Sequence, residues 1–228
     1  MKYENRTEFQ LLPQKRLFIT TNRKAKDVTE WYYYCLKKGL RDIFLLAPYA
    51  VKNRDLIGFA NTTESSIVCI YNGGKVSAFS PYWQYDESNK MWNILYTEYD
   101  WPNAPSEKAR FENNSERLKA VLLQIKELAY NLDNIGFADI FQKAIDILSG
   151  STDFPDVGYG LPLPQIPKEN LHIFEAASTA DVFGGMGSWN DSPPYAARSK
   201  GLEKEYEELS NELFKQIRLA ILYAINEW

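Results

Sequence analysis

The sequence predicts an α+β fold, in which an N-terminal antiparallel β-meander, about residues 43–101, is covered by C-terminal amphipathic helices. Two observations predict this class. Runs rich in β-branched and aromatic residues, separated by turn signals, lie before residue 101. The long segments with apolar residues at helical spacing begin only after residue 114. Segregated runs of strands and helices are typical of α+β proteins rather than of βαβ winding.

The first elements are a short strand, expected over residues 17–20, and a helix within "KDVTEWYYYCLKKGL". Asp27 or Thr29 can cap the start of this helix, because their side-chain oxygens accept from free backbone N–H groups. Gly39 suits the left-handed residue that commonly follows the last helical turn. The apolar run "DIFLLAPYA", residues 42–50, then predicts a buried strand.

A hairpin is the strongest local prediction. "SSIVCIY" and "KVSAFSPYW" flank Asn72-Gly73-Gly74. An Asn-Gly pair favours a tight turn whose two central residues have positive φ. A second turn at "YDESNK" leads to "MWNILYTEYDW", whose alternation predicts a strand with one solvent-facing side.

Four helices are expected in the second half. The first begins at Asn114 or Ser115, and the second covers residues 134–148 after a short connection, so the two should pack antiparallel. A third is expected over residues 169–183 and a fourth from about 202 to 225.

We expect residues 1–228 to form a single domain, because a meander with one apolar face needs a cover. The alternative is a division into a β-rich part, residues 1–110, and a helical part, residues 111–228.

Composition limits the classes of function. The chain has 228 residues, a formal net charge of -4 and a large aromatic content of 15 Tyr, 12 Phe and 6 Trp. Nucleic acid is disfavoured as a partner, because binding to phosphates depends on Lys and Arg contacts. The N-terminus lacks an apolar signal core and no apolar run reaches membrane-spanning length. We therefore expect a cytoplasmic protein without membrane contact.

The residues that usually carry catalysis are scarce. The single histidine, His172, starts a predicted helix, where a packing or surface role is commoner than a catalytic one. Cys35 and Cys69 are interpreted as buried free thiols. The sequence has no zinc-ligand spacing, calcium loop or phosphate loop, so we expect neither a metal nor a cofactor. These features favour a protein that is not an enzyme.

The glycine-rich segment "FGGMGSWNDSPP", residues 183–194, is the first candidate binding surface. Its candidate contact residues are Gly185, Gly187, Trp189, Asn190 and Asp191. At least one glycine is expected to have a positive φ. Two roles stay open for the tryptophan. It either anchors the loop by burial or lies at the edge of a concavity and contacts a ligand.

The second candidate surface lies in residues 81–102, with candidate contact residues Trp83, Tyr85, Trp92, Tyr96 and Trp101. Residues two apart on a strand share a face, so Trp92 and Tyr96 lie on the face that also holds Glu98. The rings either fill a core or line a groove.

We expect a non-catalytic binding protein that uses an acidic, Tyr- and Trp-rich surface, in the manner of an inhibitor or immunity protein. Its partner would be a protein or a small molecule, and a homodimer is a further alternative. The alternative function is a hydrolase or transferase that acts on a sugar or nucleotide. It would use a carboxylate pair in an aromatic-lined cleft, with Asp86, Glu98 and Asp100 nearby.

Overall fold

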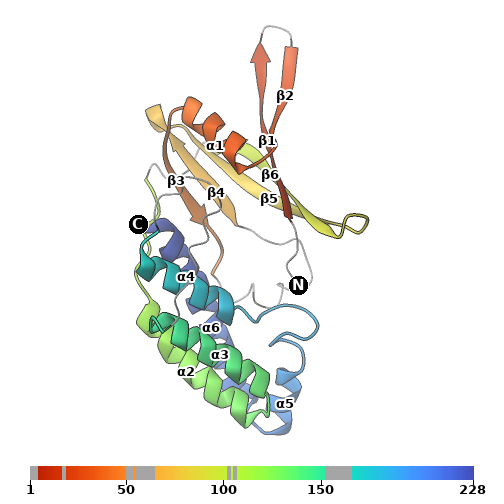
Figure 1. Cartoon of the computed structure of the whole chain (residues 1–228), viewed down its shortest axis with the longest axis vertical. Coiled ribbons are helices and arrows are strands. Elements are labelled where there is room, and N and C mark those ends of the chain that lie inside the picture. The colour runs from red at the N-terminus through yellow and green to blue at the C-terminus, as the bar shows by residue number, and fades with distance from the viewer. Residues whose placement is uncertain are drawn as a thin grey trace. The chain divides into compact units, whose positions relative to one another are not determined.

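A computed structural model of the chain describes residues 5–16, 19–49, 54, 65–101, 104, 107–151 and 166–228. Its internal contacts divide the chain into two compact units. The sheet unit comprises residues 1–47 and 61–109, and the helical unit comprises residues 48–60 and 110–228. The predicted α+β class is confirmed, with the strands in the first half and most helices in the second (Figure 1).

The predicted meander is confirmed as four antiparallel strands. These are β3 (Leu40–Leu46), β4 (Ser66–Tyr71), β5 (Val76–Asp86) and β6 (Met91–Asp100). The sheet extends beyond them, because β1 (Asn5–Arg16) pairs in parallel with β6 and carries β2 (Ile19–Ala25) on its other side. The sheet is therefore mixed, with the order β2-β1-β6-β5-β4-β3.

The expected short strand over residues 17–20 is confirmed at Ile19 and Thr20, which begin the longer strand β2. Residues 17 and 18 lie outside the described residues. The 12-residue strand β1 was not predicted at all.

The β4–β5 hairpin is confirmed, but its left-handed residues are shifted by one position. The turn η2 (Asn72–Gly74) is a single 3-10 turn, closed by a 2.8 Å hydrogen bond from the backbone N of Tyr71 to the carbonyl of Lys75. Gly73 and Gly74 have φ values of 79° and 78°. The Asn-Gly pattern predicted positive φ at Asn72 and Gly73. In the structure the two residues with positive φ are Gly73 and Gly74.

Helix α1 (Val28–Lys37) is held at its start by a reciprocal pair of caps. Asp27 Oδ1 accepts from the backbone N of Glu30 at 2.8 Å, and Glu30 Oε2 accepts from the backbone N of Lys26 at 2.9 Å. The predicted Asp27 cap is confirmed. Gly39 follows the helix with φ 81°, which confirms the predicted left-handed end.

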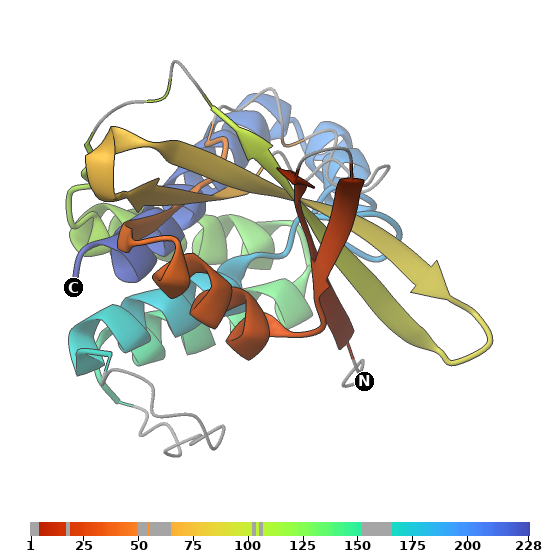
Figure 2. The same ribbon diagram turned by 90° about the horizontal axis from the view of Figure 1, so that it is seen from above.

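Helix α1 packs on one face of the sheet (Figure 2). Its Trp31 ring stacks on Phe9 of β1, with centroids 4.6 Å apart, and Cys35 is fully buried beside Cys69 of β4 in the same cluster. A second apolar cluster lies on the opposite face and includes Phe44, Val68, Ile70, Val76 and Ala78. Each face of the central strands therefore has its own core.

We expect Gly39→Ala to lower the free energy of unfolding by about 1–2 kcal/mol, because a left-handed φ is costly for any residue with a Cβ. The added Cβ would also lie 3.0 Å from Asn72 Nδ2. Urea unfolding followed by circular dichroism measures this loss.

Gly136→Ala is the matched control. Gly136 lies inside a helix, and its added Cβ would meet no atom within 4 Å in the described part of the chain. That change should be neutral or stabilise the protein by up to about 1 kcal/mol. Equal losses in the two variants would contradict the role assigned to Gly39.

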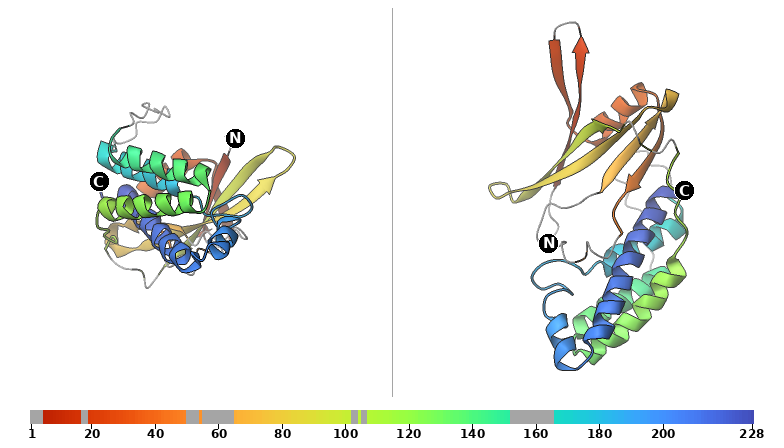
Figure 3. Two further views of the ribbon diagram at one scale, coloured as in Figure 1. Left: turned by 90° about the horizontal axis from the view of Figure 1, so that it is seen from below. Right: turned by 180° about the vertical axis from the view of Figure 1, so that it is seen from behind.

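The helical unit contains α2 (Ser115–Asn131), α3 (Ile135–Leu148), α4 (Lys168–Ala180), α5 (Pro193–Ser199) and α6 (Glu203–Asn226). The four long helices match the four predicted ones and pack side by side (Figure 3). The short helix α5, which begins with two prolines, was not predicted. Proline is well suited to the first helical turn, where its missing N–H costs nothing. None of the described helices is long and apolar enough to cross a membrane.

Candidate functional site

The tryptophan of the glycine-rich segment is wholly buried. Trp189 has 0% exposed surface, and its Nε1 donates to Ser210 Oγ at 2.8 Å. Tyr206 of α6 donates its hydroxyl to the carbonyl of Trp189 at 2.7 Å. The rings of Phe137 and Phe141 meet the indole edge-on, with centroids 5.2 and 5.4 Å away. This geometry is that of an anchor inside the helical unit.

The neighbouring loop residues are engaged within the same unit. Gly187 has φ 81°, which confirms the predicted positive φ, and its N donates to Asp191 Oδ2 at 2.8 Å. The carbonyl of Gly185 accepts from the backbone N of Ser188 at 3.1 Å. Asn190 Nδ2 donates to the carbonyl of Arg54 at 3.4 Å. These bonds fix the shape of the loop.

The expectation that Trp189 lies at the edge of a concavity therefore needs correction. A side chain without exposed surface cannot contact a ligand in this conformation. We assign Trp189 an anchoring role within the helical unit. A binding role for Gly185, Gly187, Asn190 and Asp191 stays a prediction.

Three of the predicted strand aromatics form one group, which we call the aromatic cluster: Trp83, Tyr85 and Trp92. Tyr85 lies directly opposite Trp92 across β5 and β6, and their ring centroids are 5.2 Å apart. The Trp83 ring meets Trp92 edge-on at 6.3 Å. The two indoles are half-buried, and Tyr85 is 39% exposed. The cluster occupies the end of the β5–β6 hairpin that lies next to its turn (Figure 1).

The other two predicted aromatics lie elsewhere. Tyr96 shares the sheet face of the cluster but stacks on Phe9 at 5.1 Å, within the core beneath α1. Burial raises the pKa of its hydroxyl. Trp101 packs on the opposite face, against the cluster that contains Phe44 and Val68. Of the five aromatic residues predicted from the sequence, three therefore form one partly exposed group and two pack in the cores of the sheet unit.

An open hollow of about 850 Å³ lies between β6 and the start of α1. Its apolar lining includes Phe9, Val28, Ile67, Met91, Ile94 and Tyr96. Ile94, which lines the hollow, lies directly opposite Trp83, so the cluster and the hollow are neighbours along β6. Arg6 and Lys26 stand at its rim together with Asp27.

The carboxylate that sequence reasoning placed near this surface, Glu98, is part of the interior. Its side chain is 0% exposed. Oε1 accepts from Lys38 Nζ at 2.7 Å and from Ser77 Oγ at 3.0 Å. Oε2 accepts from the backbone N of Leu12 at 2.9 Å and from the Tyr34 hydroxyl at 3.2 Å. Four donors, from β1, from β5, from α1 and from the residue that ends α1, make this carboxylate a structural acceptor.

The other two carboxylates are engaged locally. Asp86 accepts from the side chain and backbone of Asn89 and from the backbone of Ser88, and these bonds lower its pKa. Asp100 pairs with Lys75 at 3.3 Å on the exposed surface.

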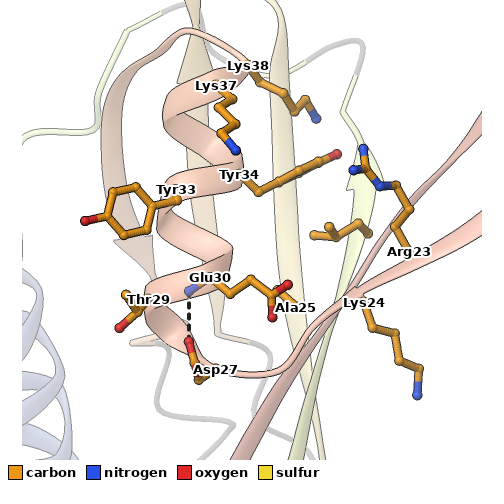
Figure 4. A pocket seen from close by; sticks show the side chains of 11 residues that line it. Arg23, Lys24, Ala25, Asp27, Thr29, Glu30, Tyr33, Tyr34, Lys37 and Lys38 are labelled. Carbon is orange, nitrogen blue, oxygen red and sulfur yellow. Dashed lines mark hydrogen bonds between the residues drawn. The ribbon is translucent and has the colours of Figure 1, made fainter.

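A pocket that the sequence did not reveal lies between α1 and the β1–β2 hairpin (Figure 4). It has a volume of about 790 Å³. Its lining contains two tyrosines, two carboxylates and four cationic side chains: Tyr33, Tyr34, Asp27, Glu30, Arg23, Lys24, Lys37 and Lys38. Burial and the nearby Glu98 raise the pKa of Tyr34, so its hydroxyl stays protonated. The available signal was a pair of short basic runs, "NRKAK" and "KK", on either side of the helix.

The two cysteines and the histidine do not form a metal-binding cluster in the described part of the chain. Cys35 and Cys69 are free and buried, as predicted, and the Tyr71 hydroxyl donates to Cys35 Sγ at 3.7 Å. His172 is half-buried in α4. Across the described ranges, no group of three or more His, Cys, Asp or Glu residues is arranged to hold a metal ion.

No protein-family model, curated protein or solved structure matches the chain.

Proposed function

We propose that the chain is a non-catalytic binding protein that holds a protein partner on the aromatic cluster of Trp83, Tyr85 and Trp92. One observation carries the proposal: the rings of Trp83 and Tyr85 both contact Trp92 on a single sheet face, while all three side chains keep part of their surface exposed. Tryptophan and tyrosine dominate the binding energy of protein interfaces, where they sit in groups surrounded by weaker contacts.

The surroundings of the cluster support the same role. Ile94 links it to the apolar hollow, so a partner side chain can extend from the rings toward α1. Among the described residues, no acceptor pairs with Trp83 Nε1. A partner that supplies an acceptor would satisfy this shielded donor, whose lack of a hydrogen bond is unfavourable in the free protein.

The charges beside the cluster are mixed rather than acidic. Asp86 ends β5 and Glu87 begins the turn that follows it, while Arg6 and Lys26 line the hollow. The rings, and not an acidic surface, would therefore supply the contact with the partner.

A pair of tyrosines on one strand gives the sharpest test. We expect Tyr85→Ala to weaken partner binding at least about 10-fold, because truncating an interface hot spot costs more than about 1–2 kcal/mol. The partner is first identified by affinity capture from extracts of the producing cells, and the dissociation constant is then measured by titration with the purified partner.

Tyr82→Ala is the matched control. Tyr82 belongs to the same strand and is 55% exposed, but it lies on the opposite face, across from Leu95. It should change the dissociation constant less than about twofold. Failure of the wild-type protein to retain a partner, or equal weakening in the two variants, would contradict the proposal.

A further inference from the structure

Helix α1 carries apolar or aromatic side chains around most of its circumference. Of its ten residues, only Thr29, Glu30 and Lys37 are neither apolar nor aromatic. Trp31 and Cys35 turn inward and are buried on the sheet. A helix that is apolar on every side is usually covered on every side. The outward face of α1 therefore has the composition of an interface.

Three large side chains are exposed on this outward face. Tyr32, Tyr33 and Leu36 are 45%, 60% and 43% exposed. With the exposed Thr29 they follow the spacing i, i+3, i+4 and i+7, which places the four side chains in one stripe about two turns long. This spacing forms the contact seam when two helices pair. Thr29 and Tyr33 point away from Arg23 of β2, so the β1–β2 hairpin leaves them accessible (Figure 4).

Two charged side chains flank the stripe. Glu30 and Lys37 are both exposed, and they are seven residues apart, so they lie on the same flank about 10 Å apart along the helix axis. Glu30 uses one of its two oxygens, Oε2, in the helix cap. In an antiparallel pair of α1 helices, related by a two-fold axis near Tyr33, the Glu30 of each copy lies opposite the Lys37 of the other. A parallel pair would place like charges together.

We propose that the outward face of α1 binds a second copy of the chain, so that two α1 helices pack antiparallel in a homodimer. A two-fold contact uses the same surface on both copies, and this stripe and its flank are complementary to themselves in that orientation. The Glu30–Lys37 pair then occurs twice. The surface is distinct from the aromatic cluster, so the inference does not depend on the proposed function.

The size of the contact sets the expected affinity. Helix α1 has ten residues and is about 15 Å long. A single pair of helices of this length is small compared with the roughly 1,200–2,000 Å² that stable interfaces bury. We therefore expect a reversible dimer with a dissociation constant of about 1–100 µM.

Sedimentation velocity of the full chain, from about 1 to 300 µM, tests the dimer. We expect the wild type to shift from monomer to dimer over this range. The double variant Tyr33→Glu/Leu36→Glu should weaken the dimer at least about 10-fold, because it places charges in the centre of the contact, where they lose water. A wild type that stays monomeric at the highest concentration would overturn the proposal.

Tyr130→Glu/Ile135→Glu is the matched control. It also changes one tyrosine and one aliphatic side chain, and these are 44% and 62% exposed in the helical unit. It should change the dissociation constant less than about twofold. Equal weakening in the two double variants would contradict the assignment of the contact to α1. Circular dichroism checks that each variant is folded.

Charge exchange tests the antiparallel orientation. Lys37→Glu should weaken the dimer at least about threefold, because it turns two attractive pairs into two repulsive ones. The exchange Glu30→Lys/Lys37→Glu restores opposite charges across the contact and should return the dissociation constant to within about twofold of the wild type. In a parallel dimer Lys37→Glu would leave like charges facing each other, as before. No effect of the single variant, or no recovery in the exchange, would refute the antiparallel pair.

Discussion

Replacing Trp189 by alanine is expected to lower the free energy of unfolding of the helical unit by about 3–5 kcal/mol, as for emptying a buried aromatic site. The indole is enclosed by Phe137, Phe141 and Tyr206, so its removal leaves a cavity among rigid rings. The change also takes the donor away from Ser210, which is fully buried. Chemical unfolding followed by far-ultraviolet circular dichroism measures the loss without relying on tryptophan fluorescence.

Two further variants make the Trp189 result specific. Trp189→Phe keeps an aromatic ring but cannot donate to Ser210, so its loss should be smaller, about 1–3 kcal/mol. Trp228→Ala removes a tryptophan that is 49% exposed and should stay within about 0.5 kcal/mol of the wild type. A loss below about 1 kcal/mol in Trp189→Ala would refute the anchoring role and restore the loop as a binding surface.

Glu98→Gln is expected to destabilise the sheet unit by about 3–5 kcal/mol, as when one partner of a buried ion pair is removed. The amide has nearly the same shape, but it replaces one acceptor oxygen by a donor. Lys38 then keeps its charge with 23% of its side chain exposed and loses the carboxylate that balances it. Urea unfolding of the variant, with circular dichroism as the signal, gives the magnitude.

Asp100→Asn is the matched control for Glu98, since it lies two residues further along the same strand. Its pair with Lys75 is exposed on both sides, at 56% and 55% of the side-chain surface. Exposed pairs contribute about 0–1 kcal/mol, so this variant should unfold almost as the wild type does. Similar losses in the two variants would show that the four-donor arrangement adds nothing beyond an ordinary surface charge.

Local signals explain which elements the sequence could predict. Some signals act within a few residues of the chain, so the sequence alone predicts them. They are the Asp27 cap, the left-handed Gly39 and the glycines of the β4–β5 turn. The amphipathic helices are equally local, because one apolar stripe defines each of them. The four-strand meander follows from consecutive hairpins.

Long-range pairing explains what the sequence could not predict. β1 pairs with β6 in parallel, and the two strands are far apart in the chain, so no hairpin turn between them signals the pairing. The basic pocket depends on how β2 and α1 approach each other, which no spacing reveals. Likewise, burial of Trp189 depends on α3 and α6, so the sequence left its two roles undecided.

The parallel pairing of the first strand with the last has a consequence during synthesis. Leu12 donates to Glu98, 86 positions later, so this contact cannot form until both have left the ribosome. At translation rates of about 5–20 residues per second, β1 waits roughly 4–17 s with one edge open. Helix α1, made in the meantime, carries Lys38 and Tyr34, which also await that carboxylate. The first strand to be made therefore cannot complete its pairing until the last strand of the sheet has been made.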